Sequence, residues 1–280
     1  MNITPKYIPF LDGKWKFSVG LKEIEMDSWL DKDQGYDSDI EQKIDLSKYH
    51  TDEVFVELPE SRDAQEEVLH LMQSLLKFSG TSWTTRTIWR LPLPSLMAAG
   101  LAVQEDLCIM TRKPEAWILS AGSISFPSFW SPKEKLGKTL DQIHSPVPKW
   151  NCKIGKVINQ KMDDLPVGVP YERFNWTITT EPDKFQPSGA RYRHAVSDPT
   201  YIKDNFFVRT ERQILYKLER TKDILFTIRT YLNPISFVEQ NDSWRIAMHD
   251  AIVSSDVDTL EYKGVTSEYL GFMLEYLSGK

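Results

Sequence analysis

Two long β-rich segments near the carboxyl end constrain the fold of this chain most strongly. Residues 205–218 (NFFVRTERQILYKL) and 224–235 (ILFTIRTYLNPI) combine β-branched, aromatic and long apolar residues. Only the polar stretch 219–223 (ERTKD) separates them, which predicts an antiparallel hairpin. A further strand is expected at 174–179 (FNWTIT), so the later part of the chain is β-rich.

Two more strands are predicted upstream of this hairpin. Residues 106–130 read as two strands joined by a turn at Lys113-Pro114-Glu115, and the second strand ends at Pro127. The chain order is therefore two strands, helices and three strands, with helical segments at both ends. This order predicts an α+β fold with an antiparallel sheet. It is compatible with a PAS-like sheet that carries its helices on one side.

Several helices are expected from periodicity and end signals. Apolar residues at helical spacing predict helices over 59–76, where Ser61 is a candidate cap, and over 93–106. The clearest local signal is Ser131-Pro132-Lys133-Glu134, a capping box with proline at the first helical position. It predicts a helix through EKLGKTLDQIH that stops before Pro146. Another helix is expected at about 152–164.

We expect three parts along the chain. Residues 1–105 form an acidic amino-terminal arm and a helical extension that pack on the core, and residues 106–236 form the PAS-like core. Residues 237–280 form a carboxyl-terminal helical extension. Within the core, the proline-rich stretch 181–204 reads as a long irregular loop, and loops of that length are usually functional or mobile.

The composition excludes several classes of function. The chain has 34 Lys and Arg against 40 Asp and Glu, a formal net charge of −6, which argues against nucleic-acid binding. Its two cysteines, Cys108 and Cys152, fit no disulfide scaffold, thiolate zinc site or iron–sulfur cluster. No apolar run of membrane-spanning length and no signal peptide is present, so we expect a soluble, cytoplasmic protein without membrane association.

Histidine is the first candidate for chemistry. The five histidines lack HxH or HExxH spacing, so a site that takes several imidazoles from one element is not encoded. His144 follows Leu136 and Leu140 at four-residue steps, on or beside the stripe that its helix turns inward. From spacing it reads either as a half-buried histidine at a helix end or as the single imidazole ligand of a bound cofactor.

Charged residues in the hairpin strands are the second candidate. Period-2 alternation puts Arg209 and Glu211 on one face of the first strand and Arg212 on the other. In the second strand, Arg229 and Tyr231 share a face. These residues form either a solvated face with cross-strand ion pairs or the polar wall of a pocket.

Tryptophans near the expected sheet are the third candidate. Trp117, Trp130, Trp150 and Trp176 surround the expected sheet, and they fit core packing as well as an aromatic cavity for a flat cofactor. The sequence contains no GxGxxG, P-loop or GxSxG motif. Nucleotide-dependent and serine-hydrolase functions therefore lose their main support.

Several segments together resemble a known family. They are VQEDLCIM (103–110), FPSFWSPKEKLGKTLDQIHSPVP (126–148), RFNWTIT (173–179), FQP (185–187), RTERQIL (209–215), FTIRTYLNPI (226–235) and, more weakly, WKFSVGL (15–21). The sequence is similar to the heme-carrying alpha subunit of the heme-dependent oxidative N-demethylases. The resemblance implies a PAS-like domain that binds heme b and oxidatively demethylates a small secondary amine, such as dimethylamine, with O2. It also implies that electrons come from a separate flavin and iron–sulfur reductase protein.

The resemblance assigns roles to particular residues. His144 stands in the IHSPVP block and becomes the expected proximal ligand of the heme iron, with His194 as the reserve candidate. Trp176 and Arg212 are expected to bind the cofactor. Arg209, Glu211, Arg229 and Tyr231 are expected at the catalytic distal wall. Glu211 would hold the amine in its protonated, cationic form, and Arg209 or Arg229 would stabilise negative charge over the iron or neutralise heme propionates.

Two alternatives to the monooxygenase remain open at the level of sequence. Because the chain has no flavin fingerprint and no cysteine cluster, it shows no route for reducing its own heme. One alternative is therefore a heme-binding PAS-like sensor of gas or redox state, or a heme carrier without turnover. The other is an α+β interaction protein without a cofactor.

Overall fold

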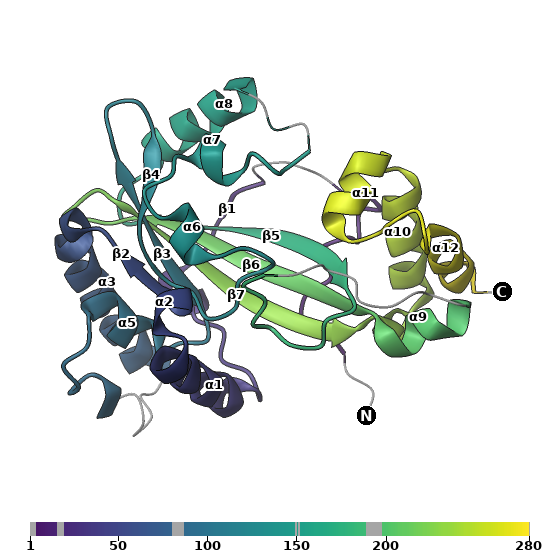
Figure 1. The fold of residues 1–280 in the computed structure, drawn as a ribbon, viewed down its shortest axis with the longest axis horizontal. Coiled ribbons are helices and arrows are strands. Elements are labelled where there is room, and N and C mark those ends of the chain that lie inside the picture. Colours follow the sequence, from purple (N-terminus) through teal and green to yellow (C-terminus); the bar gives the residue numbers. More distant parts are fainter. Residues whose placement is uncertain are drawn as a thin grey trace.

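A computed structural model describes residues 4–15, 20–79, 87–148, 150, 152–188 and 198–279. Within them, the centre of the molecule is an antiparallel sheet of seven strands in the order β1-β5-β6-β7-β3-β4-β2 (Figure 1). The strands are β1 (Lys22–Glu23), β2 (Phe55–Glu57), β3 (Asp106–Arg112), β4 (Trp117–Ser123), β5 (Pro170–Thr179), β6 (Phe207–Lys217) and β7 (Ile224–Pro234). The predicted α+β class with an antiparallel sheet is confirmed.

The predicted hairpin is the longest pairing in the described sheet. Strands β6 and β7 pair from Phe207 opposite Pro234 to Lys217 opposite Ile224. The connection closes with a backbone bond from the Leu218 amide to the Asp223 carbonyl at 2.9 Å. The upstream pair, β3 and β4, is confirmed as well, and the predicted strand at 174–179 is the second half of the longer β5.

Helices cover both faces of the sheet, so the expectation of helices on one side is wrong. The face that carries Ile109, Ile214 and Leu225, here the α3 face, packs against α3 (Arg62–Ser79) and α5 (Ser95–Gly100). The opposite face carries Cys108, Leu215 and Phe226. This α8 face packs against α7 (Leu140–Ile143) and α8 (Cys152–Asp163). The physical reason is that the central strands bear apolar residues on both sides.

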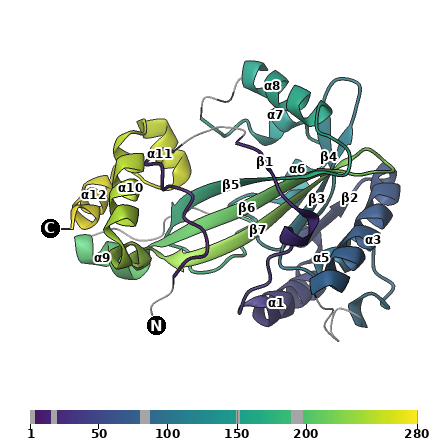
Figure 2. The same ribbon diagram turned by 180° about the vertical axis from the view of Figure 1, so that it is seen from behind.

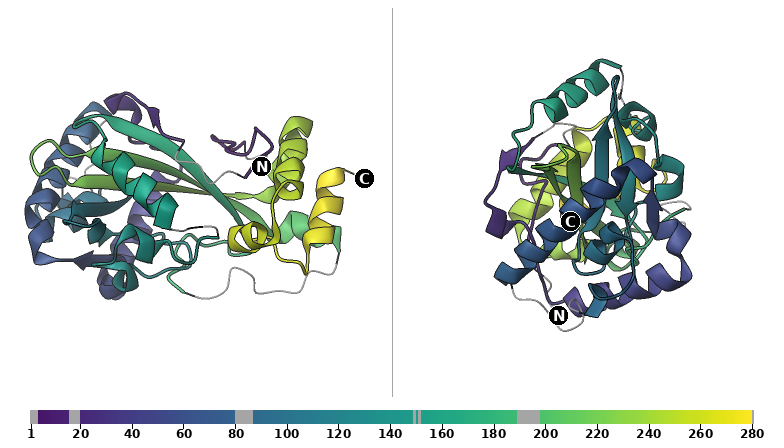
Figure 3. Two further views of the ribbon diagram at one scale, coloured as in Figure 1. Left: turned by 90° about the horizontal axis from the view of Figure 1, so that it is seen from above. Right: turned by 90° about the vertical axis from the view of Figure 1, so that its left-hand side faces the viewer.

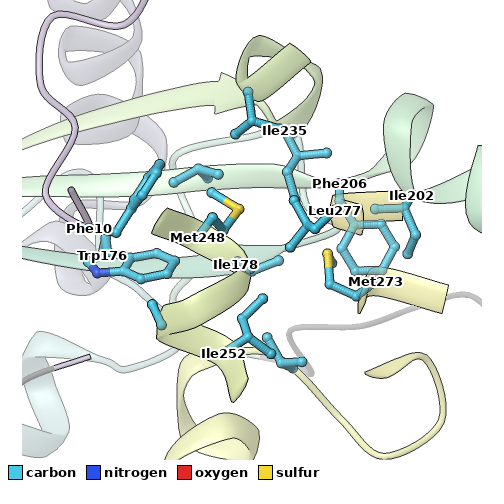
Figure 4. Close-up of a cluster of buried hydrophobic side chains, with 14 of the residues drawn as sticks. Phe10, Trp176, Ile178, Ile202, Phe206, Ile235, Met248, Ile252, Met273 and Leu277 are labelled. Atoms are coloured by element: carbon cyan, nitrogen blue, oxygen red, sulfur yellow. The ribbon is translucent and has the colours of Figure 1, made fainter. Parts of the chain in front are cut away.

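The helices at the carboxyl end gather at one end of the sheet and build their own core (Figures 1, 3 and 4). They are α9 (Pro199–Asn205), α10 (Asp242–Val253), α11 (Val257–Lys263) and α12 (Leu270–Ser278). Phe10, Ile178, Phe206 and Met248 are among the buried residues of this cluster. The helical extension predicted from residue 237 onward contains α10, which begins after its cap Asn241. The predicted irregular stretch 181–204 contains the start of α9, and residues 189–197 lie outside the described part.

The helix predicted to start at Ser131 is broken into two short pieces. Ser131 makes no side-chain cap bond, and α6 (Pro132–Lys135) ends before Gly137, whose φ is +74°. The capping box lies instead at Thr139 and Gln142, where α7 begins. Backbone pairing explains the break, because the Gly137 amide bonds to Leu119 and the chain here lies along β4. Backbone hydrogen bonds to the edge of β4 therefore replace the hydrogen bonds that a continued helix would make.

The helix predicted over 93–106 is also shorter than expected, since α5 ends at Gly100. A Cβ at this position would lie 2.3 Å from the Ser123 hydroxyl, so α5 packs closely on β4 only because residue 100 is glycine. The helices predicted at 59–76 and 152–164 are confirmed as α3 and α8.

The amino-terminal part is integral to the sheet. It forms α1 (Tyr36–Tyr49) and α2 (Thr51–Val54), and it supplies the edge strands β1 and β2. Trp29 is fully buried and donates its indole N–H to the Thr227 hydroxyl at 3.2 Å. The arm lies along the α3 face (Figure 2). The predicted domain boundaries at residues 105 and 236 stay predictions. In the described residues no helix has the length and apolarity to cross a membrane.

Asp223 lies at the end of the turn between β6 and β7, and the titration of its carboxyl group tests how this turn is packed. Burial raises the pKa of its carboxyl from the usual 3.8 to about 6, and repulsion from Glu67 adds to the rise. The folded state therefore holds this proton up to about pH 6, whereas the unfolded chain releases it near 3.8. Stability is consequently lost as the pH rises through this window.

We expect Asp223→Asn to raise the melting temperature at pH 7.5 and to give a gain that shrinks as the pH falls below 6. Asparagine keeps an oxygen for the bond from Thr111 without the charge. Thermal unfolding of both proteins across pH 4.5–8 measures the effect. A gain in melting temperature that does not depend on pH would contradict the raised pKa of Asp223.

Candidate functional site

The register of β6 and β7 divides the predicted site residues between the two faces of the sheet. Arg209 and Glu211 lie on the α8 face, because they alternate with Arg212 and share parity with Leu215. Arg212 pairs directly with Arg229 across the strands, and both lie on the α3 face. The alternation expected from the sequence is confirmed, but the charged residues do not form one common wall.

Glu211 is the centre of a buried polar cluster on the α8 face. Its carboxylate accepts bonds from Arg209 Nε at 3.3 Å, Asn175 Nδ2 at 3.2 Å and Gln213 Nε2 at 3.0 Å. Burial on its own would raise the pKa of Glu211, but the charge of Arg209 and the bonds from Asn175 and Arg209 outweigh it and lower the pKa. Glu211 is therefore an ionised carboxylate in a largely dry site.

Arg209 fixes the position of this carboxylate. The side chain is 2% exposed and donates to the backbone carbonyls of Phe126 and Lys184, the second at 3.1 Å, and to the Thr230 hydroxyl at 3.3 Å. It thereby ties two loops to the strand that carries Glu211. These contacts make Arg209 a positioning residue for Glu211 in the structure.

His144 ends α7 over the same face of the sheet. Its Nδ1 lies 2.9 Å from the Leu140 carbonyl oxygen, and its ring stacks on Trp150 with centroids 4.4 Å apart. A carbonyl oxygen can only accept, so Nδ1 carries the hydrogen and Nε2 keeps its lone pair. Burial lowers the pKa of His144, which favours the neutral ring. This is the state in which an imidazole binds a metal ion.

Arg173 on β5 connects His144 with the Glu211 cluster. Its positive charge lowers the pKa of His144, and the carboxylate of Glu211 attracts it. Burial lowers the pKa of Arg173, and its buried Nε has no hydrogen-bond partner within the described residues. Arg173 is not among the site residues predicted from the sequence, although period-2 alternation in RFNWTIT places it on one face with Asn175.

A pocket of about 140 Å³ opens beside Arg173 at the edge of β5. It is lined by Pro9, Asp12, Lys14, Trp15, Gly20, Arg173, Phe174, Asn175, Trp176 and Lys263. This volume suits a group of the size of a carboxylate and is well below that of a whole cofactor site.

The predicted site residues on the α3 face are bonded to the acidic arm. Arg229 is 1% exposed and donates to Asp33 at 2.7 Å and to Asp39 at 3.4 Å. The Tyr231 hydroxyl donates to Asp31. All of these carboxylates come from the amino-terminal segment, so Arg229 and Tyr231 fasten that segment to the sheet.

Arg212 also bonds to the amino-terminal arm. It donates to Glu172 at 2.7 Å and to the carbonyls of Ser28 and Trp29 at 2.7 and 2.6 Å. Trp176, the other predicted cofactor contact, stacks on Trp15 with centroids 3.8 Å apart and an angle of 9°. These neighbours do not place Arg212 or Trp176 beside His144. The reserve candidate His194 lies outside the described residues.

The contacts of Arg229 predict a structural effect of its removal. We expect Arg229→Met to lower the free energy of unfolding by about 2–3 kcal/mol, because it removes the charge-assisted hydrogen bonds to Asp33 and Asp39, although Lys184 still pairs with Asp39. Denaturant unfolding measures this loss, and Arg220→Met at the exposed hairpin turn is the matched control, with little expected change. A stable Arg229→Met protein that has lost activity would instead favour the catalytic role.

Comparison with known families agrees with the resemblance of the sequence blocks. A family model described as haem-dependent oxidative N-demethylase, alpha subunit-like, matches residues 20–269. The matched region includes the whole sheet, His144, Arg173 and the Glu211 cluster. The family description points to a heme-dependent oxidoreductase, and the term alpha subunit implies partner subunits. Since the match spans most of the chain, this protein belongs to the haem-dependent oxidative N-demethylase alpha subunit-like family.

Proposed function

We propose that this protein binds heme b through His144 and catalyses the oxidative N-demethylation of a small secondary amine with O2. The observation that carries the proposal is a neutral imidazole with a free Nε2 lone pair over the same face of the sheet as a buried, ionised carboxylate. Dimethylamine is the substrate that the family resemblance suggests.

The residues of the α8 face fit an iron porphyrin in their chemistry. His144 offers one nitrogen ligand whose other nitrogen is held by a carbonyl, the usual arrangement of a metal-binding histidine. Heme iron in proteins is commonly held by one such proximal histidine. Heme, when bound, would supply the oxidation chemistry, and the protein would supply orientation and charge.

Glu211 is the proposed contact for the amine. A secondary amine is protonated in water, and the ion lacks the nitrogen lone pair. The charges of Arg209 and Lys263 act on Glu211, so the surroundings of the carboxylate are cationic. Because Glu211 is ionised, it pairs with the bound ammonium ion and accepts its N–H hydrogen bond, while Arg209 holds the carboxylate in place. The dry and otherwise cationic surroundings favour release of the ammonium proton once the amine is in place.

A separate reductase is part of the proposal. The sequence contains no flavin or iron–sulfur motif, and the family description of an alpha subunit fits a protein that depends on other subunits. We propose that a flavin and iron–sulfur protein delivers the electrons and that the reaction takes place in the cytoplasm.

Formaldehyde release from dimethylamine in the presence of a reducing system tests this function. Reversible gas binding without turnover would identify a sensor or heme carrier instead.

His144→Ala tests the ligand. We expect purified wild-type protein to show a Soret band and the variant to lose most of its heme, because the proximal nitrogen is removed. His249→Ala, at a partly exposed position on α10, is the control and should retain the band. A normal Soret band in His144→Ala would refute the assignment.

Glu211→Gln tests the amine contact. Glutamine keeps an acceptor oxygen for Arg209 and Asn175 but lacks the charge, so heme occupancy should persist while turnover falls about hundredfold. Glu172→Gln, which removes a carboxylate paired with an arginine on the opposite face, is the matched control. Amine-dependent formaldehyde release measures both variants, and equal losses in the two would contradict a specific role of Glu211.

A further inference from the structure

We infer that Arg173, assisted by Lys263, forms a carboxylate-binding site at the edge of β5, and that its ligand is a heme propionate. The inference rests on the proposed binding of heme. It assigns a role to Arg173 and Lys263, which are not among the site residues predicted from the sequence.

The first observation is the unsatisfied Nε of Arg173 in the described part of the chain. Of the four arginines on β5, β6 and β7, all within the described residues, Arg209, Arg212 and Arg229 each donate several bonds to protein oxygens. The Nε of Arg173 is buried and has no partner in the described part of the chain. Glu211, the carboxylate that attracts Arg173, already accepts a bond from Arg209 Nε. A buried donor without an acceptor is costly, so a ligand oxygen is the natural partner.

The second observation is the pocket beside Arg173. Arg173, Lys14 and Lys263 place three cationic groups along its wall, against the single carboxylate of Asp12. Lys263 is 4% exposed and is held by the Asn175 side chain and by the Trp176 carbonyl at 3.2 Å. Its charge is therefore fixed at the pocket. The volume of about 140 Å³ accepts a carboxylate-sized group.

The third observation is the position of Arg173 relative to the proposed iron ligand. The register of β5 with β6 puts Arg173 opposite Gln213 and therefore on the α8 face, over which α7 ends at His144. A heme held by His144 carries its carboxylates at one edge of the ring. The planar fork of an arginine matches such a carboxylate with two parallel hydrogen bonds, and burial strengthens them.

A chemical double-mutant cycle tests the inference. Heme-free protein is titrated with hemin and with hemin dimethyl ester, which lacks the propionate charges, and the Soret band reports binding without any turnover. We expect the wild type to bind hemin about tenfold to hundredfold more tightly than the ester. Arg173→Met should lose this preference and leave ester binding unchanged, while Arg173→Lys should keep part of it.

Arg220→Met, an exposed arginine at the hairpin turn, is the control and should retain the full preference. Circular dichroism and thermal unfolding of each variant confirm that the comparison uses folded protein. An unchanged preference for hemin in folded Arg173→Met would overturn the inference and leave the proposed function intact. Absence of a Soret band with either compound in the wild type would overturn the proposed function itself.

Discussion

The pairing of β6 with β7 is the constraint on which the rest of the structure depends. Successive residues of a strand point to opposite faces, so one register decides that Glu211 faces α8 while Arg212 and Arg229 face the amino-terminal arm. A slip by one residue would exchange the two sets. Both faces carry buried charges that need specific partners. The register of the strands is therefore specified by these charges as well as by the burial of apolar side chains.

The two faces use their buried charges differently. On the α3 face, Arg229 and Tyr231 bind Asp31, Asp33 and Asp39 of the amino-terminal segment, which gives these three aspartates a structural role. On the α8 face, Glu211 is surrounded by donors, and the Nε of Arg173 has no acceptor among the described residues. One face is therefore closed by internal ion pairs, and the other has the capacity to bind a ligand.

The candidate site combines segments that are far apart in the sequence. His144 comes from the short helix α7, Arg173 and Asn175 come from β5, and Glu211 comes from β6. The break at Gly137 matters here, because the chain pairs with β4 before α7 starts afresh at Thr139. His144 is thus positioned by a helix that the edge of the sheet anchors.

The sequence by itself determined the β6–β7 hairpin, the β3–β4 pair, the alternation of Arg209 and Glu211 against Arg212, and the family, because these depend on local patterns and contiguous blocks. It also singled out His144 as a candidate ligand. Only the tertiary structure decided that helices cover both faces and that Arg229 and Tyr231 bind the amino-terminal arm. It likewise identified Arg173 as an arginine whose buried Nε has no partner within the described residues. The physical reason is that periodicity gives the face on which a side chain lies, whereas its partners come from segments up to 200 residues away along the chain.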